Sequence, residues 1–122
     1  MSQQTLISRR AGNRGAVTRL LPKIQQIIDD MARDNKIYEL EKKLADLHNK
    51  IKIIEALDGE IADKIDADEL EEEINNADRY NSSVYDSRDT AEYILSKLKK
   101  GESGATQAAA AITAASNPVT SS

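Results

Sequence analysis

The feature that most constrains this chain is a stripe of leucine and isoleucine residues through residues 37–65, spaced alternately three and four apart. This spacing puts the side chains on one helix face, as the first and fourth heptad positions do in a coiled coil. The stripe falters at Asp58, which takes a core position; the turn bends there, or Leu57 swings in to replace it. At ~1.5 Å per residue, the stretch predicts a rod of roughly 43 Å that packs on another helix.

A second long helix is predicted directly after the acidic run at residues 66–73. Acids favour the positive end of the helix dipole, and Asp66 or Asp68 can cap the open amides. A tight reversal between the two helices predicts an antiparallel hairpin. Asn81 and Arg88 fall in core positions and Ala77 and Ala91 are small, which indicates close approach to a neighbour, polar contacts that set register, or partial exposure. The seam expected to pack this hairpin or a partner helix consists of Ile37, Leu40, Leu44, Leu47, Ile51, Ile54, Ile61, Ile65, Leu70, Ile74, Val84, Leu95 and Leu98.

An additional N-terminal helix is predicted from the apolar spacing that begins at Val17. Pro22 lies within it, and proline removes a backbone donor and crowds the preceding turn. Either the helix begins near Leu21 or a longer helix kinks at Pro22, and we favour the kink because the stripe already exists at Val17. Asp34 or Asn35 is expected to cap the next helix. The expected helices cover about residues 15–33, 35–65 and 68–100 of one coiled-coil module, residues 15–100.

The two ends of the chain are predicted to lie outside the helices. Residues 1–14 are polar with scattered arginines, which is typical of a flexible basic arm, and residues 101–122 form an Ala/Ser/Thr-rich segment expected to be a disordered tail. Arginines can neutralise phosphates without reading sequence, so weak nonspecific nucleic-acid contact is one hypothesis. The candidate residues are Arg9, Arg10, Arg14 and Arg19.

Composition argues for an elongated all-α fold and against several classes of site. The 122 residues include no Cys, Phe or Trp, so thiolate chemistry and cysteine-ligated metals are excluded and the bulky side chains of a thick core are scarce. His48 is the single histidine and makes a poor metal site. We expect no enzyme activity, catalytic residue, cofactor, metal, small-molecule substrate or membrane span, and an intracellular, cytoplasmic location.

The order of these features along the chain resembles that in a known protein family. "RGAVTRLL" near the start, a long Leu/Ile heptad helix and the acidic "DELEEEINNADRY" are similar to the N-terminal helical region of Gag-like polyproteins of Pao/BEL-type LTR retrotransposons. The similarity covers roughly residues 12–100. It implies an assembly or scaffolding segment that precedes a capsid-like region, and it carries over no functional residue because the matching positions pack helices.

The leading hypothesis is therefore a non-enzymatic module for protein association, which binds itself or another helical protein. One alternative is an unrelated cytoskeletal or trafficking coiled-coil protein. A second alternative is a nucleic-acid-binding adaptor that uses the basic arm. The heptad seam can serve an intramolecular hairpin, an intermolecular coiled coil, or both.

Overall fold

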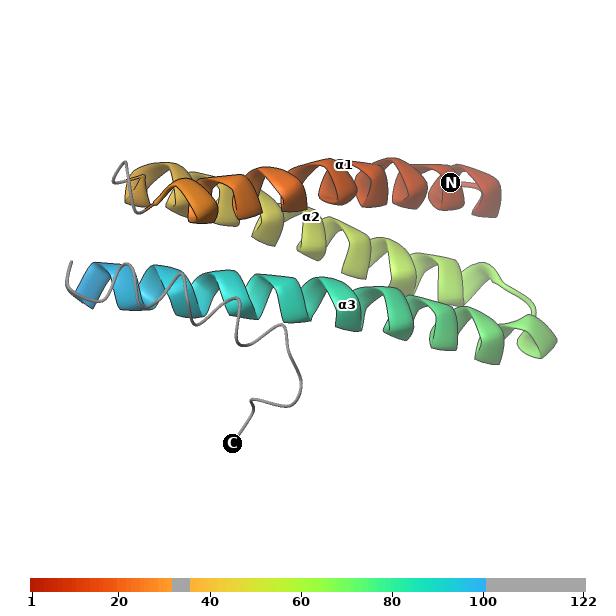
Figure 1. Cartoon of the computed structure of the whole chain (residues 1–122). Helices are drawn as coiled ribbons and strands as arrows, with labels where there is room; N and C mark the ends of the chain where they lie inside the picture. Colours follow the sequence, from red (N-terminus) through yellow and green to blue (C-terminus); the bar gives the residue numbers. More distant parts are fainter. Residues whose placement is uncertain (32–35, 101–122) are drawn as a thin grey trace, which may run out of the picture.

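The computed structural model describes residues 1–31 and 36–100, which form three long α-helices (Figure 1). Helix α1 spans Gln3–Asp30, α2 spans Ile37–Lys64 and α3 spans Ala67–Lys100. The central helix α2 runs antiparallel to both neighbours, so α1 and α3 point the same way. The described residues contain no strand, and the predicted all-α class is confirmed.

The N-terminal arm was predicted wrongly. Residues 3–14 belong to α1, which begins after Ser2, whose hydroxyl accepts a hydrogen bond from the Thr5 amide at 3.1 Å. This cap satisfies one open amide of the first turn. Leu6 then packs at 0% exposure against Leu57 and Ile61 of α2. Tertiary burial at this end therefore outweighs the low helix propensity of Gly12 and the local polarity.

Helix α1 continues through Pro22, so a helix start near Leu21 is excluded, and the kink expected at Pro22 stays a prediction. Pro22 is exposed. The cap predicted at Asp34 or Asn35 and the tail predicted at residues 101–122 lie outside the described residues. Asp66 directly precedes α3, and its carbonyl accepts from the Glu69 amide at 3.0 Å.

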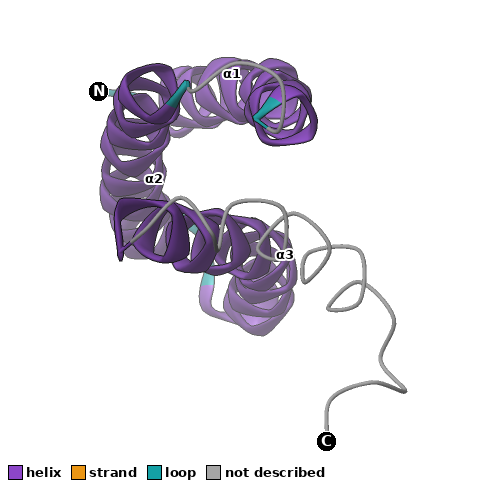
Figure 2. Cartoon of the chain, turned by 60° about the vertical axis from the view of Figure 1, so that its left-hand side comes forward, coloured by secondary structure: helices purple, strands orange, loops and turns teal. Residues whose placement is uncertain are grey.

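Helices α2 and α3 form the expected antiparallel hairpin (Figure 1), but α2 packs more extensively against α1. Helix α3 packs on α2 less extensively, and the backbones of α1 and α3 come close at few positions. Figure 2 shows the resulting arrangement, with α2 between the other two helices and one side open. The heptad stripe of α2 therefore packs mainly on α1. This corrects the prediction that its nearest partner would be the helix that follows the acidic run, which is α3.

The interior consists of two apolar clusters. The larger one joins all three helices and includes Val17, Ile24, Leu47, Ile54 and Ile94. The smaller one holds Leu6, Leu57 and Ile61 near the α2–α3 turn. Fully burying one Leu or Ile side chain contributes about 1.5–3 kcal/mol, so these clusters supply the main drive for folding.

Most of the predicted seam lies inside. The buried members of the seam are Leu40, Leu44, Leu47, Ile51, Ile54, Ile61, Val84 and Leu98. The half-buried members are Ile37, Ile65, Leu70 and Leu95. Ile74 is the exception, with 45% of its surface exposed, because its turn of α3 faces solvent beside α2. Buried positions outside the predicted seam include Leu57, which takes the core position beside Asp58, and Ile94.

None of the helices in the described part of the chain is long and apolar enough to cross a lipid bilayer.

Candidate functional site

A polar network lies between the two apolar clusters and joins all three helices. Arg10 of α1 is only 8% exposed. Its guanidinium donates to Asp58 of α2 at 2.9 Å and to both carboxylate oxygens of Glu73 of α3 at 2.6 and 3.0 Å. Asn81 of α3 donates to the second oxygen of Asp58 at 2.9 Å. One buried cation is therefore shared by carboxylates from two other helices, a geometry that favours a single axial alignment of the three.

The charges in this network stabilise one another. The hydrogen bond from Arg10 lowers the pKa of Glu73, because it favours the ionised carboxylate and outweighs the opposing effect of burial. The same bond with Glu73 raises the pKa of Arg10. Both groups are therefore held in their charged forms in the folded chain, as a buried ion pair requires.

Arg14 lies one helical turn after Arg10 and stacks on an aromatic ring. Its guanidinium carbon is 4.3 Å from the centre of the Tyr80 ring on α3. Burial lowers the pKa of Arg14, with the Arg10 charge acting in the same direction, and burial raises the pKa of Tyr80. Within the described residues the Tyr80 hydroxyl and two Arg14 nitrogens lack a hydrogen-bond partner. The main contact of Arg14 is therefore its stacking on Tyr80. Its Nη2 atom also lies 3.8 Å from Oδ1 of Asp58, as a longer ion pair.

The three polar residues that the sequence places at core positions of the heptads, Asp58, Asn81 and Arg88, divide into two kinds. Asp58 and Asn81 meet directly in the network. Arg88 instead lies toward the surface, where it pairs with Asp89 at 3.0 Å and sits over the Tyr85 ring at 4.7 Å. The principal cation of the network, Arg10, and its partner Glu73 were not predicted, because their contact joins residues 63 apart and leaves no local pattern.

The four arginines proposed for nucleic-acid contact do not form one surface. Arg9 and Arg19 are exposed, whereas Arg10 is buried and Arg14 is half-buried against Tyr80. The positive charge of Arg10 is already compensated by two carboxylates. The basic-arm hypothesis in its original form therefore loses two of its four candidate residues to the interior.

Contacts between exposed side chains also connect α2 to α3. His48 Nε2 lies 2.6 Å from a Glu92 carboxylate oxygen, and Lys99 Nζ lies 2.8 Å from Glu41. The Tyr85 hydroxyl donates to Glu55, a hydrogen bond that raises the pKa of Tyr85 to about 12. His48 thus has a local carboxylate partner, and in the described part of the chain no group of three or more His, Asp or Glu side chains could hold a metal ion.

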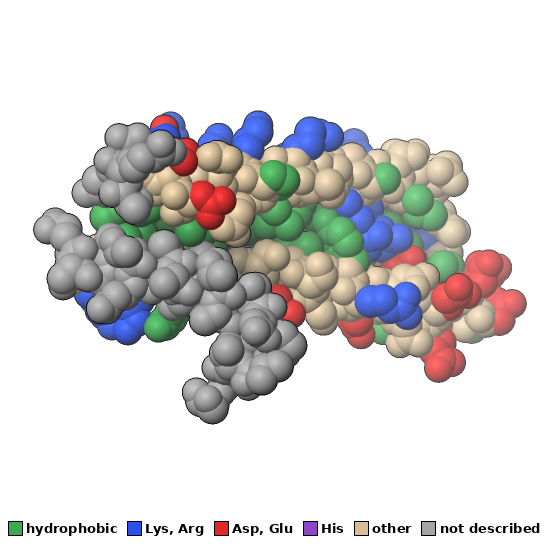
Figure 3. Space-filling view, in the orientation of Figure 1, with side chains coloured by type: hydrophobic (Ala, Val, Ile, Leu, Met, Phe, Trp, Pro, Cys, Tyr) green, Lys and Arg blue, Asp and Glu red, His purple; other side chains and the backbone are tan. Residues whose placement is uncertain are grey.

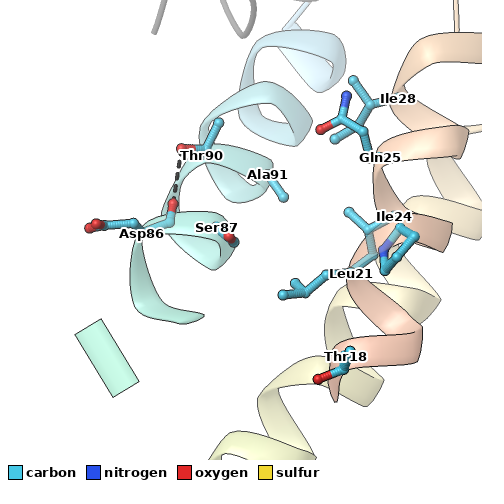
Figure 4. Close-up of a pocket in the computed structure, with 10 residues that line it drawn as sticks. Thr18, Leu21, Ile24, Gln25, Ile28, Asp86, Ser87, Thr90 and Ala91 are labelled. Atoms are coloured by element: carbon cyan, nitrogen blue, oxygen red, sulfur yellow. Dashed lines mark hydrogen bonds between the residues drawn. The ribbon is translucent and has the colours of Figure 1, made fainter. Parts of the chain in front are cut away.

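The open side of the molecule holds an apolar groove between α1 and α3 (Figure 4). Leu21, Ile24 and Ile28 come from α1, and Ala91 comes from α3. The groove has a volume of about 570 Å³. Polar side chains form its rim, and Asp86 is the one charged residue among those that line it. A mostly uncharged concave surface between two parallel helices suits an apolar helix face.

Comparisons with protein-family models, with curated proteins and with solved structures find no match to this chain. The resemblance to Gag-like polyproteins therefore stays a prediction, and functional arguments depend on the polar network, the groove and the surface charges.

Proposed function

We propose that this chain is a non-enzymatic protein-association module that acts in the cytoplasm. The apolar groove between α1 and α3 is the observation that carries the proposal. Its walls include Leu21, Ile24, Ile28 and Ala91, and no described helix covers it. A concave surface lined by apolar side chains and left open between two helices can accept an apolar face of a partner helix. A scaffolding role of this type is also what the resemblance to the N-terminal segment of Gag-like polyproteins implies.

The occupant that we propose for the groove is a second copy of the chain. In a twofold dimer each copy presents the same surface, so that surface must be compatible with itself. With Asp86 as the one charge among the lining residues, two grooves can face each other with few like-charge contacts. Helices α1 and α3 of each copy would then cover the open side of the other.

Sedimentation velocity at about 0.5 M salt tests this proposal, because salt at that level screens surface charges and leaves apolar contact intact. We expect the chain to shift from monomer to dimer as concentration rises. The double variant Gln25→Lys/Ser87→Lys places a cation on each wall and should keep the chain monomeric. A wild-type chain that remains monomeric throughout would overturn the proposal.

A matched control is available on the same helices. Gln25 and Gln26 each hydrogen-bond an aspartate four residues later, but Gln26 does not line the groove. The control Gln26→Lys/Ser96→Lys therefore adds the same charge at exposed positions outside the groove. It should dimerise like the wild type.

The Gag-like part of the proposal has its own test in the DNA beside the gene. A protease or reverse-transcriptase reading frame next to it would support a retroelement origin. Flanking frames of unrelated cellular genes would favour the cytoskeletal or trafficking alternative, with the association function unchanged.

A further inference from the structure

A second surface lies between α1 and α2, whereas the groove lies between α1 and α3, and it carries positive charge. A shallow depression between α1 and α2 is lined by Arg19 and Lys23 of α1 and by Lys43, Lys50 and Ile53 of α2. We call these residues the basic strip. In the described part of the chain no carboxylate forms an ion pair with any of its four cations, although Asp46 lines the same depression. Figure 3 shows Lys and Arg side chains along the outer edge of α1.

The start of α3 carries the opposite charge. Glu71, Ile74 and Asp78 recur at steps of three and four residues, so they lie on one exposed face, which we call the acidic stripe. Figure 3 shows acidic side chains gathered at this end of the molecule. The sequence from residue 66 to residue 78 contains acids and no base. None of the described residues forms an ion pair with Glu71 or Asp78.

The two surfaces also match in their apolar content and spacing. Ile53 is 42% exposed beside the cations, and Ile74 is 45% exposed between the acids. Lys43 and Lys50 lie seven positions apart in the sequence, and so do Glu71 and Asp78. Seven helical residues span about 10 Å in both cases, so two lysines of one copy can meet two carboxylates of the other at the same time.

We propose that the acidic stripe of one copy docks on the basic strip of a second copy. The two surfaces differ, so the contact is head-to-tail and leaves one free surface at each end, from which further copies can add. The inference rests on the proposed association function but uses a different surface. Together the apolar groove and this charged contact would build an extended assembly from one kind of chain.

A second copy fits the basic strip better than nucleic acid does. The chain carries a net charge of -4, and its acidic end repels phosphates. No tyrosine lines the strip, so it offers no ring on which bases stack. The exposed Ile53 among the cations matches a partner that brings both carboxylates and an apolar side chain.

Sedimentation velocity at low ionic strength, about 20 mM, gives the first test, because exposed charges interact most strongly there. We expect species larger than a dimer that disappear at about 0.5 M salt, where the groove dimer remains. Lys43→Gln/Lys50→Gln and Glu71→Gln/Asp78→Asn should each weaken this growth about tenfold, as the loss of two exposed ion pairs predicts. The control Lys52→Gln/Lys97→Gln removes equal charge from exposed positions outside the strip and should assemble like the wild type.

Mixing the two variants gives a sharper test. The strip variant keeps its acidic stripe and the stripe variant keeps its basic strip, so one intact contact can form between them and none can follow it. To remove the groove dimer, both are prepared with Gln25→Lys/Ser87→Lys. We expect each to be monomeric alone and the mixture to give a 1:1 heterodimer at low salt.

Three results would overturn the inference. The first is a mixture of the two variants that stays monomeric at low salt. The second is a wild-type chain that never exceeds a dimer at low salt, which would leave the groove proposal standing. The third is a wild-type chain that forms nothing larger than a dimer and binds a single-stranded RNA oligonucleotide through Lys43 and Lys50. The basic strip would then be a nucleic-acid site.

Discussion

At the scale of single residues, the side chain with the largest expected effect is Arg10. It is 8% exposed and contacts Asp58 and Glu73, so its removal takes the hydrogen-bond partner from the Glu73 carboxylate and leaves Asp58 with Asn81 and the more distant Arg14. Breaking a buried pair from one side costs about 3 kcal/mol or more. We expect Arg10→Met to lower the free energy of unfolding by roughly that amount in urea denaturation followed by circular dichroism.

Arg9 supplies the control for this measurement. It is the preceding residue, is exposed and forms no ion pair with any described residue. Arg9→Met should change the free energy of unfolding by no more than about 0.5 kcal/mol. Equal effects of the two substitutions would contradict the burial of Arg10.

Glu73 gives the network a pH dependence whose sign follows from its lowered pKa. Arg10 holds the folded-state pKa below the ordinary value of 4.5, so the unfolded chain binds more protons in the acid range. The stabilisation is complete above about pH 4.5 and is lost as pH falls through the folded pKa. Glu73→Gln should therefore lower the free energy of unfolding, and the difference from the wild type should be largest at neutral pH. A deficit that is equally large near pH 3 would show that the ionised carboxylate contributes nothing.

At the scale of the helices, the sequence predicts elements well where the apolar period is long. The helices expected at 35–65 and 68–100 occur as Ile37–Lys64 and Ala67–Lys100. The first twelve residues of α1 were missed because Gly12 and Gly15 suggested a break, and Leu6 and Ile7 are too few to establish a period. What makes this stretch helical is contact with residues of α2 that are about 50 positions away in the sequence, so it leaves no local signal.

Gly12 tests whether this stretch is helical in solution. A Cβ at this position would meet nothing within 4 Å, and the residue lies in the interior of α1. Alanine is favoured over glycine by about 1 kcal/mol in a helix interior, so Gly12→Ala should raise the free energy of unfolding by up to that amount. Gly59→Ala in α2 has the same open surroundings and should give a similar gain. A gain at Gly59 with none at Gly12 would indicate a non-helical N-terminal segment.

At the scale of the whole molecule, the pairing of helices was less predictable than the helices themselves. Three amphipathic stripes can pack in more than one order, and heptad spacing in α2 is compatible with either neighbour. The tertiary network favours the observed order, because Arg10 must reach Asp58 and Glu73 at once. The groove and the basic strip were also not predictable from the sequence, because each combines residues from two helices and its position depends on how those helices pack.

Because α2 packs against both other helices, damage to its buried face should spread through the whole molecule. Leu47 is 0% exposed in the cluster that joins all three helices. An aspartate there would put an unpaired charge in an apolar environment, at a cost of several kcal/mol that is comparable to the total stability of a small domain. We expect Leu47→Asp to abolish most of the far-ultraviolet circular dichroism signal and to remove hydrogen-exchange protection from α1 and α3 as well as α2. The control Ala45→Asp adds the same charge at an exposed position two residues away and should keep both signals. If protection were lost in α2 while α1 stayed protected, the three helices would not fold as one cooperative unit.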